Sequence, residues 1–247
     1  MKLVHRLGAA FLLSSVALTP VAAQVSIAAA VADKDRPQAD RERDADRKPA
    51  EMLKFAGVKP GMTVVDMLPG GGYFTRLFSD VVGPKGKVIA YIPDEMLGKN
   101  QAALERANAF AAGHPNIQVM HDPLMAPPPP GLLADVVWTS QNYHDLHNMA
   151  GVDVVAVNKL IFQGIKPGGV YIVLDHAAPA GSGLAATNTT HRIDPAAVKA
   201  EVIAAGFVFD GESKVLANPA DNHELKVFDP SLRGKTDQFV YRFKKPK

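Results

Sequence analysis

Apolar and polar positions form blocks along the chain that predict strands and helices in turn. Short, nearly continuous apolar runs predict strands that are buried on both faces. The expected strands are residues 63–68, 87–92, 117–120, 134–140, 169–174, 207–216 and 238–243, and the expected helices are residues 50–56, 73–81, 98–112, 152–164 and 195–205. Strands separated by helices of this length predict a parallel sheet with right-handed crossovers. The last two strands are expected to pair antiparallel, because no helical pattern separates them.

Residues 1–23 have the pattern of a secretory signal peptide. Lys2 and Arg6 precede an apolar run that is shorter than the roughly 20 residues of a membrane span, and small residues follow it. The alternatives are an uncleaved anchor and a buried helix. We therefore expect a periplasmic or secreted protein without stable membrane insertion after cleavage. An exported form would depend on its core alone for stability, because the chain contains no Cys.

The composition is that of a folded globular protein, with 47% hydrophobic and 21% charged residues among 247. Residues 24–38 predict a linker, and the alternating charges of residues 39–48 predict either a solvated face or a strap across the fold. Residues 49–247 are expected to form one domain. Loss of Lys2 and Arg6 with the leader leaves 25 basic and 25 acidic residues, and this balance argues against binding of nucleic acid. The pattern indicates no oligomeric state.

Three glycines follow the first expected strand and precede a helical pattern. Gly70, Gly71 and Gly72 allow a ligand to approach the backbone next to unpaired N–H groups at the start of a helix, which suits a carboxylate or a phosphate. The dinucleotide fingerprint would need a glycine where Thr75 stands. An acid just before the glycines, Asp66, suits instead a ligand that carries an ammonium beside its carboxylate.

This segment resembles the first motif of the class I S-adenosylmethionine (SAM) methyltransferases, acid-x-Gly-x-Gly-x-Gly. Asp66, Gly70 and Gly72 match the motif, and Leu68 replaces its first glycine. Residues 164–169 resemble the Leu-Lys-Pro-Gly-Gly turn of that family, and residues 204–207 resemble the start of its sixth strand. More narrowly, residues 44–75 and 142–148 resemble a group of exported, poorly characterised bacterial proteins named as predicted methyltransferases.

The resemblance implies a fold and a cofactor. The fold is a single α/β domain with a Rossmann-like, doubly wound and mostly parallel seven-stranded sheet. Its strand order is 3-2-1-4-5-7-6, with the last strand antiparallel and helices on both faces. The cofactor is SAM, and the methyl acceptor is a small molecule or an envelope component. The residues expected to bind the cofactor are Asp66, Gly70, Gly71, Gly72, Tyr73, Asp94, Asp122 and Asn142.

Two of these acids lie near the positions that the family uses for the nucleoside. The family usually has an acid for the ribose hydroxyls at the end of the second strand, where this chain has Ile92, and Asp94 follows two residues later. Asp122 stands where the family often places an acid near the adenine amino group. A turn acid before Pro123 is the alternative interpretation of Asp122.

A polar cluster, residues 141–148, follows the fourth expected strand, and open α/β sheets bind their ligands at the carboxyl ends of such strands. Methyl transfer from a sulfonium requires alignment of the two partners and, for an O–H or N–H acceptor, removal of a proton. His144 is the expected general base, because imidazole titrates near neutrality. Tyr143 is expected to orient the acceptor or to lie against the donor.

Two other functions stay open at this point. Leu68 and Ile92 depart from the family pattern, as they would in a non-catalytic or repurposed binding protein with this fold. His144 and His147, together with Asp145, Asp175 or His176, form an alternative ligand set for the divalent metal of a hydrolase. The preferred function involves no metal. The long connection over residues 217–237 and the charged N-terminal segment are expected to cover the acceptor site.

Overall fold

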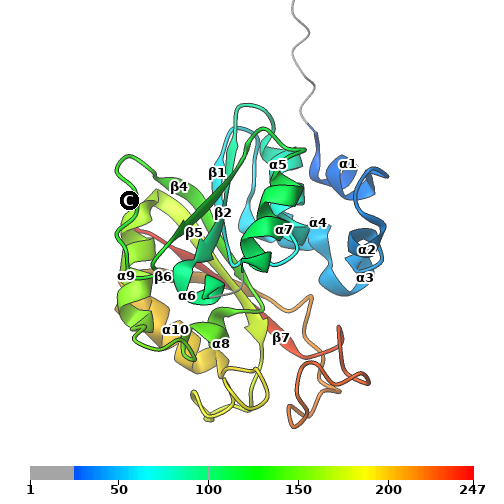
Figure 1. The fold of residues 1–247 in the computed structure, drawn as a ribbon. Coiled ribbons are helices and arrows are strands. Elements are labelled where there is room, and N and C mark those ends of the chain that lie inside the picture. The colour runs from blue at the N-terminus through cyan, green and yellow to red at the C-terminus, as the bar shows by residue number, and fades with distance from the viewer. Residues whose placement is uncertain (1–24, 99–100) are drawn as a thin grey trace, which may run out of the picture.

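A seven-stranded sheet forms the centre of the computed structural model, which describes residues 25–98 and 101–247 (Figure 1). The expected signal peptide lies outside the described residues. The strands are β1 (Thr63–Met67), β2 (Lys87–Pro93), β3 (Ile117–Asp122), β4 (Ala134–Ser140), β5 (Ile165–His176), β6 (Val208–Ser213) and β7 (Gln238–Lys244). Their order is β3-β2-β1-β4-β5-β7-β6, and β7 runs antiparallel to both of its neighbours. The predicted fold class and strand order are confirmed.

Helices connect the strands and cover the sheet. The helices are α1 (Ile27–Ala32), α2 (Gln38–Arg41), α3 (Asp44–Arg47), α4 (Pro49–Ala56), α5 (Tyr73–Val82), α6 (Asp94–Leu97), α7 (Ala102–Ala111), α8 (Tyr143–Leu146), α9 (Val154–Gly164) and α10 (Pro195–Ala204). None of the helices in the described ranges combines the length and the apolar character that a membrane crossing requires.

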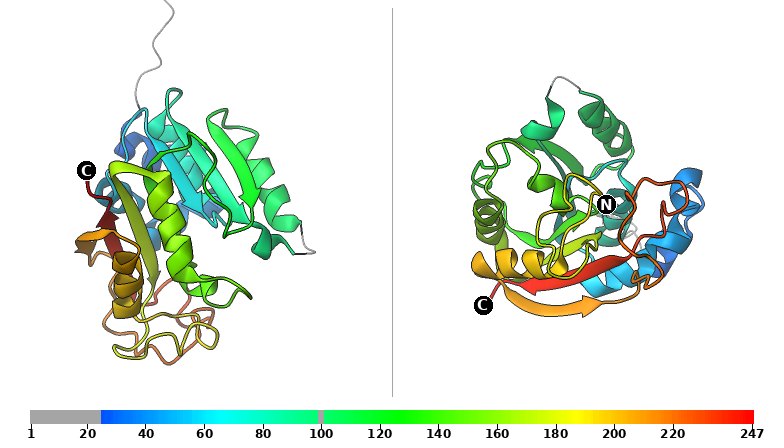
Figure 2. Two further views of the ribbon diagram at one scale, coloured as in Figure 1. Left: turned by 90° about the vertical axis from the view of Figure 1, so that its left-hand side faces the viewer. Right: turned by 90° about the horizontal axis from the view of Figure 1, so that it is seen from below.

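Both faces of the sheet are buried, which explains the continuous apolar runs of the sequence. On one face, α1, α4 and α5 pack over side chains such as Val64 and Trp138. On the other face, α8, α9 and α10 pack over side chains such as Val137 and Tyr171 (Figure 2). Because successive side chains of a strand point to opposite faces, each central strand contributes to both cores.

The expected helix over residues 98–112 is wrong in its extent. The chain forms α6 immediately after β2, and α7 begins only at Ala102. Gly98 ends α6 with a φ of 46° and a ψ of −126°, a conformation that side chains with a Cβ rarely adopt. The helix that follows is therefore shorter than expected, and Asp94, directly after β2, belongs to the separate short helix α6.

Part of the expected linker is helical and packed into the fold. Ser26 caps α1 by accepting a hydrogen bond from the backbone N–H of Ala29, 3.1 Å away. The side chain of Ala30 is 1% exposed and belongs to the core shared with α4 and α5. The small alanine side chains of this run allow the helices to pack closely. The same alanine-rich composition is also typical of a linker, so composition alone does not predict the helix.

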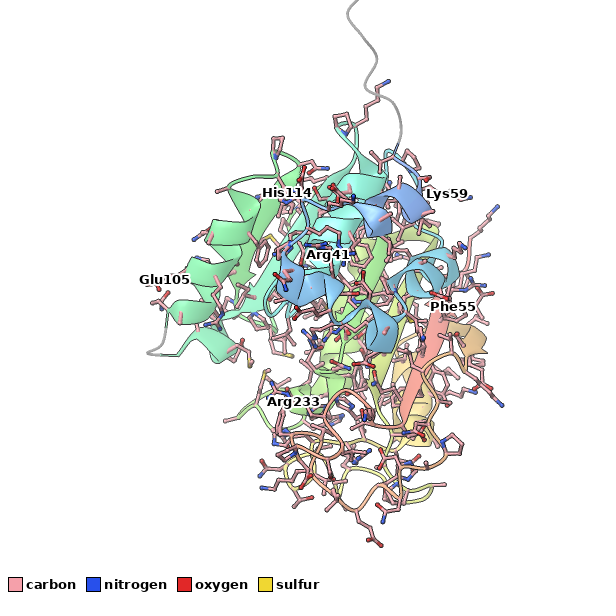
Figure 3. The ribbon with its side chains drawn as sticks, turned by 90° about the vertical axis from the view of Figure 1, so that its right-hand side faces the viewer. Arg41, Phe55, Lys59, Glu105, His114 and Arg233 are labelled. Carbon is pink, nitrogen blue, oxygen red and sulfur yellow. The ribbon has the colours of Figure 1, made fainter. Side chains whose placement is uncertain are left out.

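The charged N-terminal segment forms a strap and not only a solvated face. Figure 3 shows its helices lying across the outer side of the molecule, with Arg41 at the surface. The Asp40 carboxylate accepts a hydrogen bond from the Arg76 guanidinium of α5, with a 2.9 Å Nε–Oδ2 distance. Arg36 holds Asp44 through two parallel hydrogen bonds of 2.8 and 2.9 Å. Some of the alternating charges therefore form ion pairs with each other and with α5, and these pairs hold the strap over the start of α5.

Candidate active site

The turn after β1 keeps the backbone of a glycine motif although Leu68 replaces one of the glycines. The φ angle of Leu68 is 58°, in the left-handed region, and those of Gly70 and Gly72 are 56° and 79°. A residue with a Cβ pays roughly 1–2 kcal/mol for this conformation. The Asn142 side chain stabilises it, since its amide donates hydrogen bonds to the carbonyl oxygens of Leu68 at 3.0 Å and Met67 at 3.4 Å.

Asn142 therefore supports the glycine turn from below. Its amide nitrogen donates to the β1 turn, and its side-chain oxygen accepts a hydrogen bond from the Thr139 hydroxyl. Both polar atoms of the side chain thus have partners inside the protein, and the expected contact of Asn142 with the cofactor stays a prediction.

The three glycines serve two purposes. A Cβ atom on Gly70 or Gly71 would meet no atom within 4 Å, so the backbone there borders open space that a ligand can fill. A Cβ atom on Gly72 would lie 2.6 Å from the Phe110 ring of α7. Gly72 is thus required for close packing at the start of α5, while Gly70 and Gly71 border the candidate donor site.

Asp66 lies beneath this turn with 3% of its surface exposed. Its Oδ2 accepts a 2.6 Å hydrogen bond from the Thr75 hydroxyl of α5. Burial raises the pKa of Asp66 to about 7, although the hydrogen bond from Thr75 and the nearby charge of Arg47 act in the opposite direction. A carboxyl group with this pKa gains ionisation when a cation binds beside it.

Arg47 is a site residue that the sequence did not single out among the alternating charges. Its guanidinium lies 4.8 Å from the centroid of the Tyr73 ring, and one Nη donates a 2.8 Å hydrogen bond to the Gln141 side chain after β4. Burial lowers the pKa of Arg47 to about 10, so the side chain still carries its charge at neutral pH. Its buried Nε has no hydrogen-bond partner within residues 25–98 and 101–247, which leaves one donor for an anionic ligand.

Tyr73 is turned toward the strap. Its hydroxyl donates a 2.6 Å hydrogen bond to Asp44, and its ring lies beneath the Arg47 guanidinium. Burial, followed by the nearby Asp44 carboxylate, raises the pKa of Tyr73 above its usual range. The Tyr73 hydroxyl therefore contacts the N-terminal segment, and the Tyr73 ring supports the Arg47 guanidinium. The expected contact of Tyr73 with the cofactor stays a prediction.

The two acids expected to meet the nucleoside lie at the same edge of the sheet. β2 extends to Pro93, one residue beyond the expected end at Ile92, and Pro93 pairs with Asp122 of β3. Asp94 is consequently the first residue after the strand, where one of its carboxylate oxygens lies 3.0 Å from His121 Nδ1. Asp122 lines an apolar cavity together with Met67, Tyr91 and Leu124 among others.

The Tyr143 hydroxyl bonds to side chains of two neighbouring helices. It donates a 2.8 Å hydrogen bond to Glu201 of α10 and accepts a 2.7 Å hydrogen bond from Asn158 of α9. Consecutive residues of a helix point about 100° apart, so His144 faces a different side of α8. The expected role of Tyr143 at the acceptor stays a prediction, and these two bonds do not support it.

His147 lies on the same side of α8 as Tyr143. Its Nε2 is 3.2 Å from the Glu201 carboxylate, which the Tyr143 hydroxyl also contacts. The proposed metal pair of His144 and His147 is therefore not formed. His176 is occupied as well, since its Nδ1 lies 2.7 Å from the Thr236 hydroxyl, and burial lowers its pKa to about 4.

His144 forms a buried pair with Asp175 at the end of β5. The Nδ1 atom of His144 lies 2.9 Å from Asp175 Oδ1, and the backbone N–H of His144 donates to Oδ2 at 2.8 Å. Burial alone lowers the pKa of His144, but the Asp175 and Asp145 carboxylates raise it by more, so the net shift is upward. Burial likewise raises the pKa of Asp175, yet its contacts with His144 bring it below its usual range. The pair fixes the ring and directs Nε2 away from Asp175.

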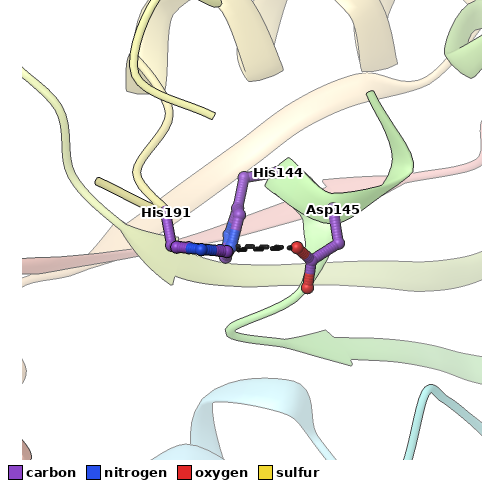
Figure 4. Close-up of side chains that lie close together, drawn as sticks. All are labelled: His144, Asp145 and His191. Atoms are coloured by element: carbon purple, nitrogen blue, oxygen red, sulfur yellow. Dashed lines mark ion pairs between the residues drawn. The ribbon is translucent and has the colours of Figure 1, made fainter. Parts of the chain in front are cut away.

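The Nε2 side of His144 faces two further polar residues (Figure 4). Asp145 Oδ1 lies 3.3 Å from His144 Nε2 and 3.7 Å from His191 Nδ1. His191 comes from the connection between β5 and α10, and its ring stands edge-on to the His144 ring at 5.5 Å. No sequence pattern predicts His191 at this place, because it is 47 residues from His144 and outside any recognisable motif.

Two long connections lie below the sheet, at the end where β5 finishes (Figures 1 and 2). A buried ion pair joins them, with Arg192 Nη1 2.9 Å from Asp221 Oδ2. Phe228 of the second connection packs on His191 with ring centroids 4.9 Å apart. The strap reaches the same region, because Asp46 Oδ2 lies 3.1 Å from the position of a Cβ on Gly234.

Comparison with known proteins identifies the family. A family model described as the ubiE/COQ5 methyltransferase family matches residues 46–194, more than half of the chain. The chain belongs to the ubiE/COQ5 methyltransferase family. The matched range contains the Asp66 turn, the His144 helix and His191, and family membership gives SAM as the cofactor. The open backbone at Gly70 and Gly71 and the unpartnered Arg47 Nε fit the amino-acid end of that cofactor.

Individual relatives agree with this family. The Ubiquinone/menaquinone biosynthesis C-methyltransferase UbiE of Shewanella woodyi is 30% identical over 128 residues, which is 51% of this chain and 47% of that protein. The chain thus spans about half the length of the curated relatives it matches.

Solved structures share the fold of this ubiE/COQ5 family member. A SAM-dependent methyltransferase from Aquifex aeolicus superposes with a TM-score of 0.59 and 20% identity, over 84% of this chain and 95% of that chain. The [4+2]-cyclase SpnF superposes with a TM-score of 0.57 and 17% identity, over 87% of this chain and 86% of that chain. Because the second protein is named as a cyclase, the fold alone does not define the reaction.

We predict that Asp66 makes the free protein less stable as the pH rises from about 4 to about 7. Its folded pKa is about 7 and its ordinary value is 3.8, so the folded state holds the proton over this range while the unfolded state releases it. The stability contributed by the protonated carboxyl is complete below the unfolded pKa and is lost through the folded pKa. Asp66→Asn removes this dependence.

Urea denaturation at pH 5, 6, 7 and 8 measures the effect. The free energy of unfolding of the Asn variant, relative to the unmodified protein, is expected to increase with pH up to about 7, by at most about 1.4 kcal/mol per pH unit. Asp35→Asn, which changes an exposed carboxyl in the loop after α1, serves as the matched control. Parallel pH profiles for the unmodified protein and Asp66→Asn would show that the carboxyl is not held protonated.

Proposed function

We propose that the protein transfers a methyl group from SAM to a small-molecule acceptor bound next to His144. One observation carries this proposal: Asn142 ties the end of β4 to the glycine turn, and His144 follows it by two residues. The candidate donor site and the candidate base are therefore fixed to each other through two adjacent strands. Catalysis of an in-line displacement depends on such alignment.

The donor end of the site offers a complementary group for each part of the cofactor. SAM supplies a methyl group on a positively charged sulfur. The backbone at Gly70 and Gly71 and the free Nε of Arg47 bind its carboxylate, and Asp66 binds its ammonium. Asp94 and Asp122 bind the nucleoside from the ends of β2 and β3. These assignments rest on the open backbone, the unpartnered donor and the positions of the two acids.

The acceptor end is built to receive a proton. Asp175 fixes the His144 ring and leaves Nε2 as the atom that faces the acceptor. A hydroxyl acceptor loses its proton on methylation, and an activated carbon acceptor does so as well. The relatives are named as C-methyltransferases of ubiquinone and menaquinone biosynthesis, which makes an activated carbon our first choice.

A small acceptor fits the site better than a large envelope component. His144 is 2% exposed, and the Phe228 and His191 rings lie on its outer side. A macromolecular acceptor would have to displace both long connections, including the buried Arg192–Asp221 pair. Breaking such a pair costs several kcal/mol.

The two sequence features that favoured a repurposed binding protein have structural explanations. Leu68 adopts a left-handed backbone that a glycine would adopt without strain, and β2 extends to Pro93, so Asp94 directly follows the strand. Neither departure removes a binding group from the donor site. These observations favour methyl transfer over a non-catalytic role.

Export to the periplasm is a separate part of the proposal and rests on the pattern of residues 1–23. A charged donor made in the cytoplasm would then need delivery, because charged groups cross hydrocarbon at high cost. Mass spectrometry of the N-terminus from a periplasmic extract tests export, with a mature N-terminus near residue 24 as the expected result. An intact N-terminus in the cytoplasmic fraction would contradict it.

We predict that Arg47→Gln weakens binding of S-adenosylhomocysteine by about 10- to 100-fold, since a charge-assisted hydrogen bond contributes roughly 1.5–3 kcal/mol. Isothermal titration calorimetry measures the affinity. Arg41→Gln is the matched control, because this arginine lies on the same strap but donates to the backbone oxygen of Arg36. Equal affinities of Arg47→Gln and the unmodified protein would place the carboxylate elsewhere.

Methyl transfer itself is tested with radiolabelled SAM and a small-molecule extract of the source cells. We expect the unmodified protein to label an extractable compound, His147→Gln to do so at a similar rate, and His144→Gln to be at least 100-fold slower with unchanged binding of S-adenosylhomocysteine. Nucleoside binding without any labelled product from the unmodified protein would instead support the repurposed alternative.

A further inference from the structure

Two imidazoles and one carboxylate meet on the outer side of His144. The nearest ligand atoms of His144, Asp145 and His191 all lie within 4.8 Å of one another. We propose that these three residues form a binding site for a divalent transition-metal ion, with His144 Nε2, Asp145 Oδ1 and His191 Nδ1 as ligands. This ligand set differs from the pair of His144 and His147 considered for a hydrolase.

His144 is oriented as a metal-bound histidine is. The Asp175 carboxylate contacts Nδ1 at 2.9 Å, so the proton resides on Nδ1 and the lone pair on Nε2. Carboxylates that hold the second nitrogen of a histidine in this way fix the ring and increase its basicity toward a metal. Nε2 points toward Asp145, and not toward the interior of the sheet.

His191 is held in place by its neighbours in the chain. Its φ angle is 58°, in the left-handed region that few residues with a Cβ adopt, and such a backbone persists where the surroundings enforce it. The next residue, Arg192, is fully buried and donates hydrogen bonds to the Ala177 carbonyl oxygen at 3.0 Å and to Asp221 at 3.1 Å. Packing against Phe228 supports the ring from the other side. The imidazole is therefore positioned by the fold and is not a freely moving surface group.

The spacing of the ligand atoms suits a small transition metal. Tetrahedral Zn²⁺ with nitrogen and oxygen ligands at about 2.0–2.2 Å separates its ligands by roughly 3.4 Å. The His144–Asp145 distance of 3.3 Å and the His191–Asp145 distance of 3.7 Å are close to this value. A shift of about an ångström by His191 would complete the three-ligand arrangement.

The site is accessible and would keep open coordination positions. The side chains of Asp145 and His191 are 32% and 28% exposed, so an ion can reach them from solvent. Two histidines and one carboxylate are a ligand set that binds Zn²⁺, Fe²⁺ or Mn²⁺, with the remaining positions available to water or to an oxygen atom of a small molecule. Hard ions such as Mg²⁺ prefer oxygen ligands and match this set poorly.

Metal binding has a consequence that rests on the proposed function. The ion and a proton compete for the same atom, His144 Nε2. A metal-loaded protein therefore cannot accept a proton there, and methyl transfer by the base mechanism would stop. Donor binding at the Gly70 turn involves other residues and would continue.

Calorimetry with Zn²⁺ alone and absorption titration with Co²⁺ test the site on the full chain. We expect one ion per chain, a visible d–d spectrum of Co²⁺ with nitrogen ligands, and an affinity at least about tenfold lower for His191→Gln and for Asp145→Asn. His147→Gln is the matched control, because it removes an imidazole from the same short helix but outside the cluster, and it is expected to bind as the unmodified protein does.

Thermal unfolding without metal confirms that each variant is folded. Absence of Zn²⁺ binding, or binding that His191→Gln and Asp145→Asn leave unchanged, would overturn the metal site. Loss of binding in His147→Gln alone would assign the ion to other ligands and overturn it too. Binding of S-adenosylhomocysteine is measured in the same samples and reports on the proposed function, so the two proposals can fail separately.

Discussion

The Asn142 amide joins the ends of β4 and β1 by donating to the carbonyl oxygen of Leu68, and the arrangement of the whole site depends on this contact. It holds the turn in a left-handed conformation that a leucine would otherwise avoid. It also fixes the distance between the glycine turn and the short helix that carries His144. The parallel pairing of β1 with β4 and of β4 with β5 then brings Asp175 to the same edge. One polar contact thus links the donor and acceptor ends.

The fold could be predicted from the sequence because both faces of the sheet are buried. Continuous apolar strands, helical segments of regular length and the missing helix before β7 predicted a mostly parallel sheet with an antiparallel last pair, and the resemblance to the SAM methyltransferases implied the strand order. Boundaries were less certain where glycine or proline acts locally: Gly98 ends α6 where the expected helix would begin, and β2 continues through Pro93. The role of α1 could not be predicted, because small alanine side chains are compatible with both a linker and a tightly packed helix.

Only those residues of the candidate site that lie close together in the sequence could be predicted. Asp66 and the glycines form one continuous motif, and His144 follows a strand end. Side-chain direction cannot be read from the sequence, which therefore does not predict the bond between the Tyr143 hydroxyl and Glu201. Arg47, Asp175 and His191 come from distant segments and meet only through the fold. The family match supports the methyltransferase assignment, and these contacts add the residues that the motif does not contain.

In the proposed function, the glycine turn after β1 holds the amino-acid end of the cofactor. A crystal structure of the protein with S-adenosylhomocysteine is the decisive measurement. We expect electron density for the carboxylate over Gly70 and Gly71 within hydrogen-bond distance of Arg47 Nε, and for the ammonium beside Asp66. Density for the nucleoside in another part of the molecule, or a ligand-free turn at saturating concentration, would show that the cofactor does not bind at this turn.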